Sequence, residues 1–262
     1  MFIYAFYRMC MHKGIKCELN GCLYGNLSMH NGYELKNVFG IDDIVKKGNI
    51  IDILSITCSD KYNSFPLVYR GLRVVYSEKA FHTKSKYLYG YWMNDQYFRD
   101  IESELKTAFD FKNIDDFNVK LSRQLSTENS VSLHIRRGDY INLPNFNICG
   151  ESYYKNAISY IEENVRSPKF YIFSDDPEWC ETYLKQFNID YRIIKHNTGT
   201  TSFRDMFLMS KCKHNIIANS TFSWWGAWLN NNSEKIVIAP ERWWKDTVVS
   251  PVPSQWTKIK NT

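Results

Sequence analysis

Residues 131–140 read VSLHIRRGDY, a short apolar run that passes directly into two arginines, a glycine and an aspartate. A run of this length bounded by polar residues predicts a buried β-strand, Val131–Ile135, followed by a polar loop. From this strand to Pro240, short apolar stretches alternate with longer amphipathic ones. That alternation predicts an α/β fold with a doubly wound parallel sheet, covered by helices on both faces.

The stretches beyond the first strand give the order of the predicted elements. The predicted strands are Phe170–Phe173, Ile189–Ile194, Asn215–Ala218 and Ile236–Ala239. The predicted helices are Tyr153–Val165, Asp176–Phe187, Ser202–Lys211 and Thr221–Leu229. Pro177 supports the second of these helices, because proline in the first turn gives up no hydrogen bond and already has a helical φ.

The half of the chain before residue 126 is less regular. It predicts helices at Met1–Lys13, Ile101–Phe109 and Ile114–Leu125, a strand at Ile15–Leu19 and a mixed stretch at Ile41–Ile56. The polar break at residues 126–130 predicts a boundary between two lobes. We therefore expect an N-terminal lobe of residues 1–128 and a C-terminal lobe of residues 129–262.

The composition excludes several classes of protein. The 262 residues are 44% hydrophobic and 23% charged, which is typical of a globular chain and excludes collagen, coiled coils and disordered proteins. The formal charge is 33 − 28 = +5, without the clustered basic stripe of a nucleic-acid-binding protein. Aromatic residues reach 16%, a level found both in sugar-binding proteins and in ordinary cores.

The cysteines are odd in number and lack metal-binding spacing, so we expect reduced thiols. They are Cys10, Cys17, Cys22, Cys58, Cys149, Cys180 and Cys212. The sequence predicts neither a membrane span nor a signal peptide, which favours the cytoplasm. The glycosylation sequons at residues 26–28, 219–221 and 231–233 are then chance matches.

Three loops are predicted to carry the chemistry. In an open parallel sheet, ligands bind outside the carboxyl ends of the strands, where the loops lead into helix N-termini. This rule selects residues 134–140, 174–177 and 219–226, which are polar directly after an apolar strand. Although these loops lie far apart in the sequence, we expect them to face one pocket.

Arg136 and Arg137 stand where the first strand ends. A guanidinium fork binds phosphate bidentately without losing its charge, so we expect this pair to bind a diphosphate, with Arg136 foremost. The alternative is that one arginine only pairs with Asp139. Residues 137–139 also spell a cell-adhesion tripeptide, a function that requires an exposed hairpin tip in a secreted protein.

The other two loops offer hydroxyls and carboxylates. Ser220, Thr221 and Ser223 fall at a predicted helix start, which binds anions; an ordinary N-cap, the alternative, explains a single hydroxyl. Asp175 and Asp176 precede another helix, where one carboxylate caps the helix and the other accepts hydrogen bonds from a base edge or a ribose. Paired carboxylates also hold Mg²⁺, but two arginines that neutralise phosphate make a metal less necessary.

Two further features have ordinary structural explanations. His134 lies within the predicted strand, where a hydrogen-bonded core histidine is the alternative to a ligand-binding one. Trp224, Trp225 and Trp228 follow each other at helical spacing, which predicts packing of the helix against the sheet.

The three loops resemble the signature segments of the bacterial α-1,2-fucosyltransferase family. The segments are HIRRGDY at 134–140, FSDDPEW at 173–179 and CKHNIIANSTFSWWGAWLN at 212–230, with weaker likenesses over residues 90–245. The resemblance implies a GT-B-like fold of two Rossmann-like lobes, with the GDP-sugar in the C-terminal lobe and the acceptor on the N-terminal one. It implies GDP-fucose as donor, the 2-hydroxyl of a β-galactoside glycan as acceptor, and inversion without metal or cofactor.

The resemblance and the loop chemistry together give the expected site residues. The expected catalytic residues are Arg136, at the β-phosphate, and Asp139. The expected donor-binding residues are His134, Arg136, Arg137, Asp175, Asp176, Asn219, Ser220, Thr221, Phe222 and Ser223. Either Asp139 or Glu151 is expected to be the general base, and no acceptor residue can be assigned.

Members of the family usually open with a strand and a glycine-rich loop before a helix that residues 1–6 resemble. We therefore expect that strand and loop to be missing here, through a misassigned start or a real loss. A real loss leaves a non-catalytic nucleotide-sugar or glycan-binding protein as the alternative to an enzyme. An acceptor on a lipid carrier would bring the protein to the inner membrane face.

Overall fold

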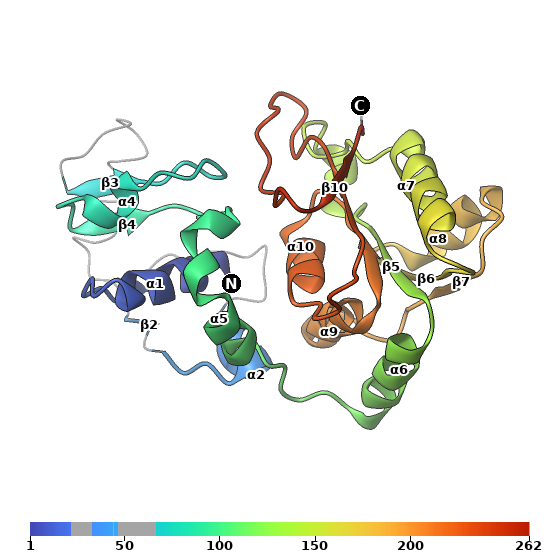
Figure 1. Cartoon of the computed structure of the whole chain (residues 1–262), viewed down its shortest axis with the longest axis horizontal. Helices are drawn as coiled ribbons and strands as arrows, with labels where there is room; N and C mark the ends of the chain where they lie inside the picture. Colours follow the sequence, from blue (N-terminus) through green and yellow to red (C-terminus); the bar gives the residue numbers. More distant parts are fainter. Residues whose placement is uncertain (22–32, 44, 47–66, 262) are drawn as a thin grey trace. The chain divides into compact units, whose positions relative to one another are not determined.

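The computed structural model describes residues 1–21, 33–43, 45–46 and 67–261. The chain divides into two compact units, Met1–Asn113 and Ile114–Thr262 (Figure 1). The division falls before helix α6 (Asp116–Thr127) and not after it, so it lies earlier than the predicted boundary at 128/129. The cause is packing, because Leu121 and Leu125 of α6 are buried in a core of the second unit.

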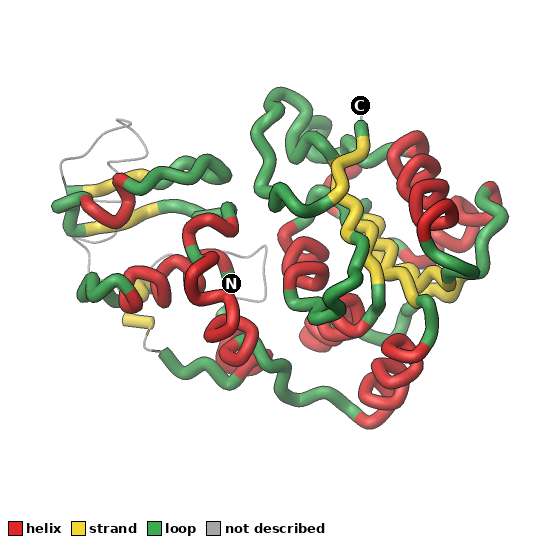
Figure 2. Tube along the Cα trace, viewed as in Figure 1, coloured by secondary structure: helices red, strands yellow, loops and turns green. Residues whose placement is uncertain are grey.

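Six parallel strands form the sheet of the second unit, in the order β10-β9-β8-β5-β6-β7. They are β5 (Ser130–Ile135), β6 (Lys169–Ser174), β7 (Tyr191–Ile193), β8 (His214–Ile216), β9 (Val237–Pro240) and β10 (Thr257–Ile259). The chain builds outward from β5 to β7, returns to β8 beside β5, and continues outward to β10. Figure 2 draws the strands of this sheet in yellow. The predicted doubly wound sheet is confirmed, and β10 is a strand that the sequence did not predict.

Helices cover both faces of this sheet because its central strand alternates in character. The helices besides α6 are α7 (Glu151–Asn164), α8 (Pro177–Tyr183), α9 (Phe203–Lys211) and α10 (Thr221–Trp228). Val131, Leu133 and Ile135 of β5 pack with α7 and α8 on one face. Ser132 and His134 point to the opposite face, where α6, α9 and α10 lie. Each large apolar side chain buried in this way contributes about 1.5–3 kcal/mol to stability.

Three polar residues on the second face, Ser132, Asn215 and Asn230, form a hydrogen-bonded group. The Asn215 amide donates to the Ser132 hydroxyl at 2.7 Å and to the Met209 carbonyl at 2.9 Å. The Asn230 amide in turn donates to the Asn215 side-chain oxygen at 2.8 Å. Because each buried group has a partner, these residues fix the position of β8 beside β5 without a desolvation penalty.

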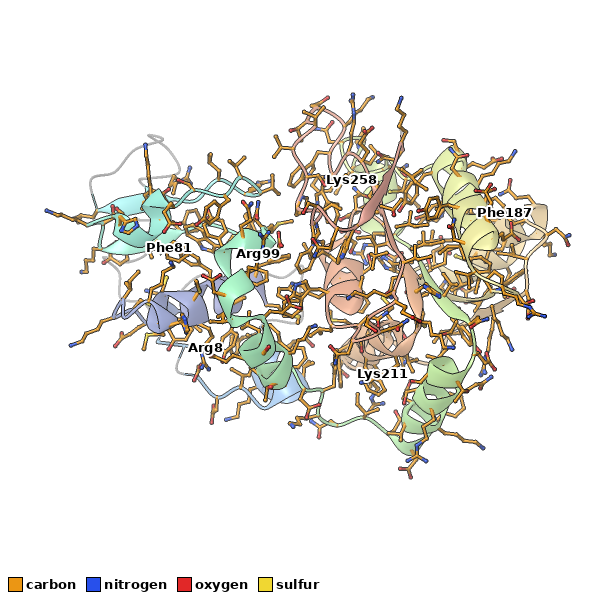
Figure 3. All side chains as sticks on the ribbon, in the orientation of Figure 1. Arg8, Phe81, Arg99, Phe187, Lys211 and Lys258 are labelled. Atoms are coloured by element: carbon orange, nitrogen blue, oxygen red, sulfur yellow. The ribbon has the colours of Figure 1, made fainter. Side chains whose placement is uncertain are left out.

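The first unit has an aromatic core and short strands. Its elements are α1 (Phe2–His12), β1 (Leu19–Asn20), α2 (Leu35–Phe39), β2 (Val45–Lys46), β3 (Val68–Arg70), α4 (Lys79–His82), β4 (Tyr87–Tyr89) and α5 (Glu102–Ala108). Phe6 stacks on Trp92 with ring centroids 3.9 Å apart, and Tyr97 and Phe81 close the cluster. Phe81 is labelled in Figure 3. The described strands form two parallel pairs, so a Rossmann-like first lobe stays a prediction.

Other predictions for this half have mixed outcomes. The predicted helices Met1–Lys13 and Ile101–Phe109 are present as α1 and α5, whereas the predicted strand Ile15–Leu19 shrinks to β1. Most of Ile41–Ile56, the sequon at 26–28, Cys22 and Cys58 lie outside the described residues. The other five cysteines are free thiols. Among the described helices, none is both long and apolar enough to cross a bilayer.

Candidate active site

The carboxyl edge of the sheet brings the three predicted loops together. The strand order reverses between β5 and β8, and at such a switch point the loops after the two strands open a ligand-binding crevice. The loop after β6 lies next to it, because Ile135 pairs with Ser174 at the end of the β5–β6 ladder. The predicted convergence is therefore present in the second unit.

Arg136 joins two of these loops. Its Nη2 lies 2.8 Å from Asp139 Oδ1, and its Nη1 lies 3.0 Å from Asp175 Oδ2. The guanidinium carbon also lies 5.5 Å from the centroid of the Tyr140 ring. These contacts hold the fork in one orientation at the end of β5, as a phosphate-binding arginine requires.

Arg137 makes a second set of contacts to the same neighbouring loop. Its Nε lies 3.0 Å from Asp176 Oδ2, and its backbone N–H donates to Asp175 Oδ1 at 2.9 Å. Its guanidinium lies 4.1 Å from the centroid of the Trp179 ring. The Asp139 pairing that the sequence left open thus belongs to Arg136, while Arg137 pairs with Asp176.

The cluster of two guanidiniums and three carboxylates is open to solvent. The side chains of Arg136 and Arg137 are 33% and 32% exposed, and those of the three aspartates are at least 25% exposed. Ion pairs in such a setting contribute little net stability, so an anion with better geometry can replace a carboxylate at modest cost. The carboxylates therefore orient the arginines without closing them to a ligand.

Gly138 permits the close approach of the two loops. A Cβ at this position would lie 2.5 Å from Asp175 Oδ2, which is far inside van der Waals contact. Any side chain would push Asp175 away from Arg136 and from the Arg137 N–H. The glycine in the RRGD segment is therefore a requirement of the site's geometry.

Asn219 ties the third loop to the first. Its Nδ2 donates to the Phe146 carbonyl at 2.9 Å and to the Trp243 carbonyl at 3.0 Å, and it is 2% exposed. Its backbone carbonyl accepts from the Tyr140 hydroxyl at 3.2 Å. The amide predicted to bind the donor is thus committed to other loops, and it positions the site instead.

The start of α10 offers fewer hydroxyls than its sequence suggests. Ser223 is 1% exposed and its Oγ donates to the Ser220 carbonyl at 3.3 Å, so its hydroxyl faces inward. Ser220 is the N-cap but makes no capping hydrogen bond, and Thr221 is exposed. The first turn of α10 therefore keeps uncapped N–H groups, which suit an anion, with Thr221 beside them.

His134 is a buried histidine whose Nδ1 has no hydrogen-bond partner in the part of the chain that the structure describes. It is 4% exposed, and its ring lies 6.0 Å from that of Phe222. Burial, assisted by the positive charge of Arg136, lowers the pKa of His134 to about 3. The imidazole is neutral at physiological pH, and an unpaired buried nitrogen is costly unless a ligand completes it.

Two further carboxylates are Glu151, which the sequence offered as a candidate base, and Asp205, which the sequence analysis did not single out. Glu151, the second candidate base, is exposed in the first turn of α7, and its contacts in the described part of the chain do not reach the arginine pair. Asp205 was missed: it is 8% exposed, and burial raises its pKa to about 7, opposed by a hydrogen bond from Asn197. The sequence feature that could have pointed to it is the position of this carboxylate on the apolar stripe of α9, four residues before Met209.

Candidate metal ligands do not gather in the described ranges. No group of three or more His, Cys, Asp or Glu side chains is arranged there to hold an ion. The three aspartates of the cluster face guanidinium groups.

This arrangement defines a class of protein. A doubly wound sheet whose switch point carries oriented arginines and an uncapped helix start is a nucleotide-binding α/β domain. Residues 66–260 match the model of glycosyl transferase family 11. The chain belongs to this family, and the prediction of a glycosyltransferase is confirmed.

Curated relatives agree with the family. An α-1,2-colitosyltransferase of Escherichia coli is 33% identical over 263 residues, covering 95% of this chain and 90% of the relative. The O-antigen biosynthesis glycosyltransferase WbnK of Escherichia coli is 49% identical over 120 residues, which cover 44% of this chain and 39% of the relative. The human galactoside α-(1,2)-fucosyltransferase 1 is 29% identical over 38% of this chain and 28% of its own length.

Solved structures give weaker matches. NodZ α-1,6-fucosyltransferase co-crystallised with GDP has a TM-score of 0.35 at 12% identity, over 55% of this chain and 51% of that one. POFUT1 in complex with GDP-fucose has a TM-score of 0.41 at 8% identity, over 89% and 90%. Because both scores are below 0.5, the fold assignment rests on the sheet of this chain.

Proposed function

We propose that this enzyme transfers L-fucose from GDP-fucose to the 2-hydroxyl of a terminal galactose, with inversion and without a metal ion. The observation that carries the proposal is the fixed orientation of Arg136 and Arg137 at the switch point of the sheet. Family membership and the relatives named as α-1,2-glycosyltransferases support the linkage and favour an enzyme over a non-catalytic binding protein.

The proposed reaction needs charge stabilisation above all. The bond between the anomeric carbon and the β-phosphate oxygen breaks, the galactose oxygen bonds to that carbon from the opposite face, and GDP leaves with the electron pair. Arg136 stabilises the β-phosphate, assisted by Arg137 and the N–H groups that begin α10. Asp139, half exposed beside Arg136, accepts the proton of the galactose hydroxyl.

The nucleoside is assigned to the carboxyl end of β5, where His134 lies. His134 is a neutral imidazole whose Nδ1 has no hydrogen-bond partner among the described residues, and Phe222 lies beside it. A neutral imidazole donates or accepts one hydrogen bond at each nitrogen, which suits the edge of a purine base. Asp175 and Asp176, expected at the base or ribose, instead hold the two arginines in this arrangement.

GDP-colitose is the second candidate donor. It is favoured by the α-1,2-colitosyltransferase that matches 95% of this chain at 33% identity. Colitose differs from fucose in lacking the 3-hydroxyl. A site that hydrogen-bonds a hydroxyl discriminates strongly against the analogue without it, so the two donors should give clearly different kcat/KM values.

We also propose a cytoplasmic location, with peripheral contact to the inner membrane face if the acceptor is lipid-linked. Cys10, Cys180 and Cys212 are buried free thiols, which a reducing compartment preserves. Sedimentation with anionic vesicles, with and without acceptor lipid, tests the membrane contact.

The decisive assay combines each GDP-sugar with a panel of galactosides in EDTA, followed by determination of the product linkage. An α-1,2 product formed at full rate in EDTA supports the proposal. A different linkage, or a rate restored only by Mg²⁺ or Mn²⁺, contradicts it.

A further inference from the structure

Two segments of the first unit, residues 67–75 and 87–93, run side by side and contain the strands β3 and β4. β3 and β4 pair in parallel with Arg70 opposite Tyr89. Beyond the strands, Gly71 N–H donates to the Tyr89 carbonyl and Met93 N–H to the Arg73 carbonyl, each at 2.9 Å. Side chains two residues apart in a strand share a face, so Tyr87 and Tyr89 of β4 lie on the same face, and Tyr91 follows after the bend at Gly90.

Arginines from the neighbouring segment lie over these tyrosine rings. The Arg70 guanidinium carbon is 5.3 Å from the centroid of Tyr89, and that of Arg73 is 5.3 Å from the centroid of Tyr91. In the part of the chain that the structure describes, Arg73 contacts no carboxylate. Tyr91 is 54% exposed, so a flat ring and a fork of hydrogen-bond donors stand together at the surface.

The chain holds Tyr91 outward through its neighbour Trp92. Trp92 is 1% exposed and stacks on Phe6 with ring centroids 3.9 Å apart. Its φ of 54° is in the left-handed region, which is strained for a residue with a side chain and is found at functional sites. A Cβ on Gly71 would lie 2.4 Å from the Trp92 ring, so the partner segment is shaped to receive it.

We propose that this surface, centred on Tyr91 and Arg73, binds the acceptor glycan; the inference rests on the proposed function. One face of a galactose ring presents C–H groups that pack on an aromatic ring, and its rim presents hydroxyls that accept hydrogen bonds from a guanidinium. A neutral sugar carries no charge to neutralise. An arginine that lies over an aromatic ring, such as Arg73 over Tyr91, can therefore bind it through hydrogen bonds. The family match includes this segment, since it begins at residue 66.

Tyr91→Ala and Tyr91→Phe test the stacking in assays with soluble β-galactosides and no lipid. We expect Tyr91→Ala to raise the acceptor KM by about tenfold and Tyr91→Phe to retain a near-normal value, because the ring carries the contact. The KM for the GDP-sugar and its slow hydrolysis by water should not change in either variant. Phe117→Ala is the matched control, because Phe117 is 53% exposed on α6 of the other unit.

Arg73→Ala tests the hydrogen-bonding half, with Arg99→Ala as control, since Arg99 is an exposed arginine of the same unit paired with Asp95 (Figure 3). Of these two variants, we expect only Arg73→Ala to raise the acceptor KM. Saturation-transfer NMR with the β-galactoside alone gives a readout that does not require turnover, and its signal should fall in Tyr91→Ala but not in Phe117→Ala.

The outcomes separate the two proposals. If the wild-type enzyme transfers no deoxyhexose to any galactoside, the proposed function fails and this inference fails with it. If the wild type is active but Tyr91→Ala matches Phe117→Ala in acceptor KM and in NMR signal, this inference alone is overturned. A Tyr91→Ala effect confined to vesicle binding also overturns it, in favour of a membrane surface.

Discussion

The two arginine-bearing surfaces of this molecule use the same side chain in different settings. In the second unit, Arg136 and Arg137 lie against the rings of Tyr140 and Trp179 and also form ion pairs with aspartates at the end of β5. In the first unit, Arg73 lies over the Tyr91 ring and contacts no carboxylate among the described residues. The settings match different ligands, because carboxylates can be exchanged for a phosphate, whereas a ring offers packing area to an uncharged sugar.

The difference also concerns how each guanidinium is held. Arg136 is fixed by two directional contacts from two loops, at 2.8 and 3.0 Å. Arg73 is fixed by a cation–π contact, which constrains its plane more than its direction. A phosphoryl leaving group needs directional donors in the transition state, while glycan binding tolerates variation. The surface with Arg136 and Arg137 should therefore govern the rate, and the surface with Arg73 and Tyr91 should govern the affinity for the acceptor.

The largest expected effect is at the first surface. Arg136→Ala should lower kcat/KM for the GDP-sugar by about 10²–10³, the usual cost of removing one preorganised donor to a developing charge. Arg136→Lys should retain only part of the kcat/KM that Arg136→Ala loses, because an ammonium lacks the bidentate fork. Steady-state kinetics and a melting curve measure both variants. Near-normal turnover in Arg136→Ala would remove this residue from the mechanism.

Gly138→Ala should produce the next largest effect. The alanine Cβ would lie 2.5 Å from Asp175 Oδ2 and would displace the carboxylate that contacts Arg136 and the Arg137 N–H. A misplacement on this scale should lower kcat by about tenfold or more while the fold persists. Gly150→Ala is the control, because a Cβ there would have no neighbour within 4 Å. Equal activity of the two variants would show that Asp175 does not position the arginines.

Sequence reasoning predicted the second unit better than the first for a physical reason. The strands of a doubly wound sheet are continuous apolar runs, and its helices carry one apolar stripe, so both periods are legible at β5, β6 and α7. The first unit is built from short segments joined by aromatic stacking, such as Phe6 on Trp92. Contacts between residues so far apart in the chain leave no local period to read.

The candidate site was predicted at the level of loops but not of contacts. The rule that ligands bind at the carboxyl edge selected three loops that the structure brings to the same edge of the sheet, and their binding of a ligand stays a prediction. The partners of individual groups depend on angles that spacing does not reveal: Asn219 and Ser223 looked like ligand-binding residues but bond within the protein. The raised pKa of Asp205 was not foreseen, because it follows from the burial of that carboxylate beside Asn197 in the folded chain.

Acid stability should depend on His134 in the second unit. Its folded-state pKa of about 3 lies below the ordinary 6.5, so between these values the unfolded chain binds a proton that the folded chain does not. Stability from this group is therefore complete above pH 6.5 and is lost as the pH falls toward 3. From pH 7 to pH 5 the loss should be about 2 kcal/mol.

His134→Gln should lack this component of acid sensitivity. The measurement is urea unfolding at pH 7 and pH 5, with His12→Gln, an exposed histidine in the last turn of α1, as the control. Identical pH dependence in wild type and His134→Gln would mean that the imidazole is not buried in the neutral form.

The smallest expected effect is a salt dependence of KM that differs between the arginine pair of the second unit and the surface with Tyr91 and Arg73. The screening length is about 10 Å at 0.1 M ionic strength, so added salt weakens the attraction between exposed guanidiniums and a diphosphate. Raising NaCl should increase the KM of the GDP-sugar by about two- to threefold. The KM of a neutral β-galactoside should stay constant, because packing on Tyr91 involves no net charge. If the acceptor KM rose in parallel, charge would dominate at both surfaces and the contrast between them would collapse.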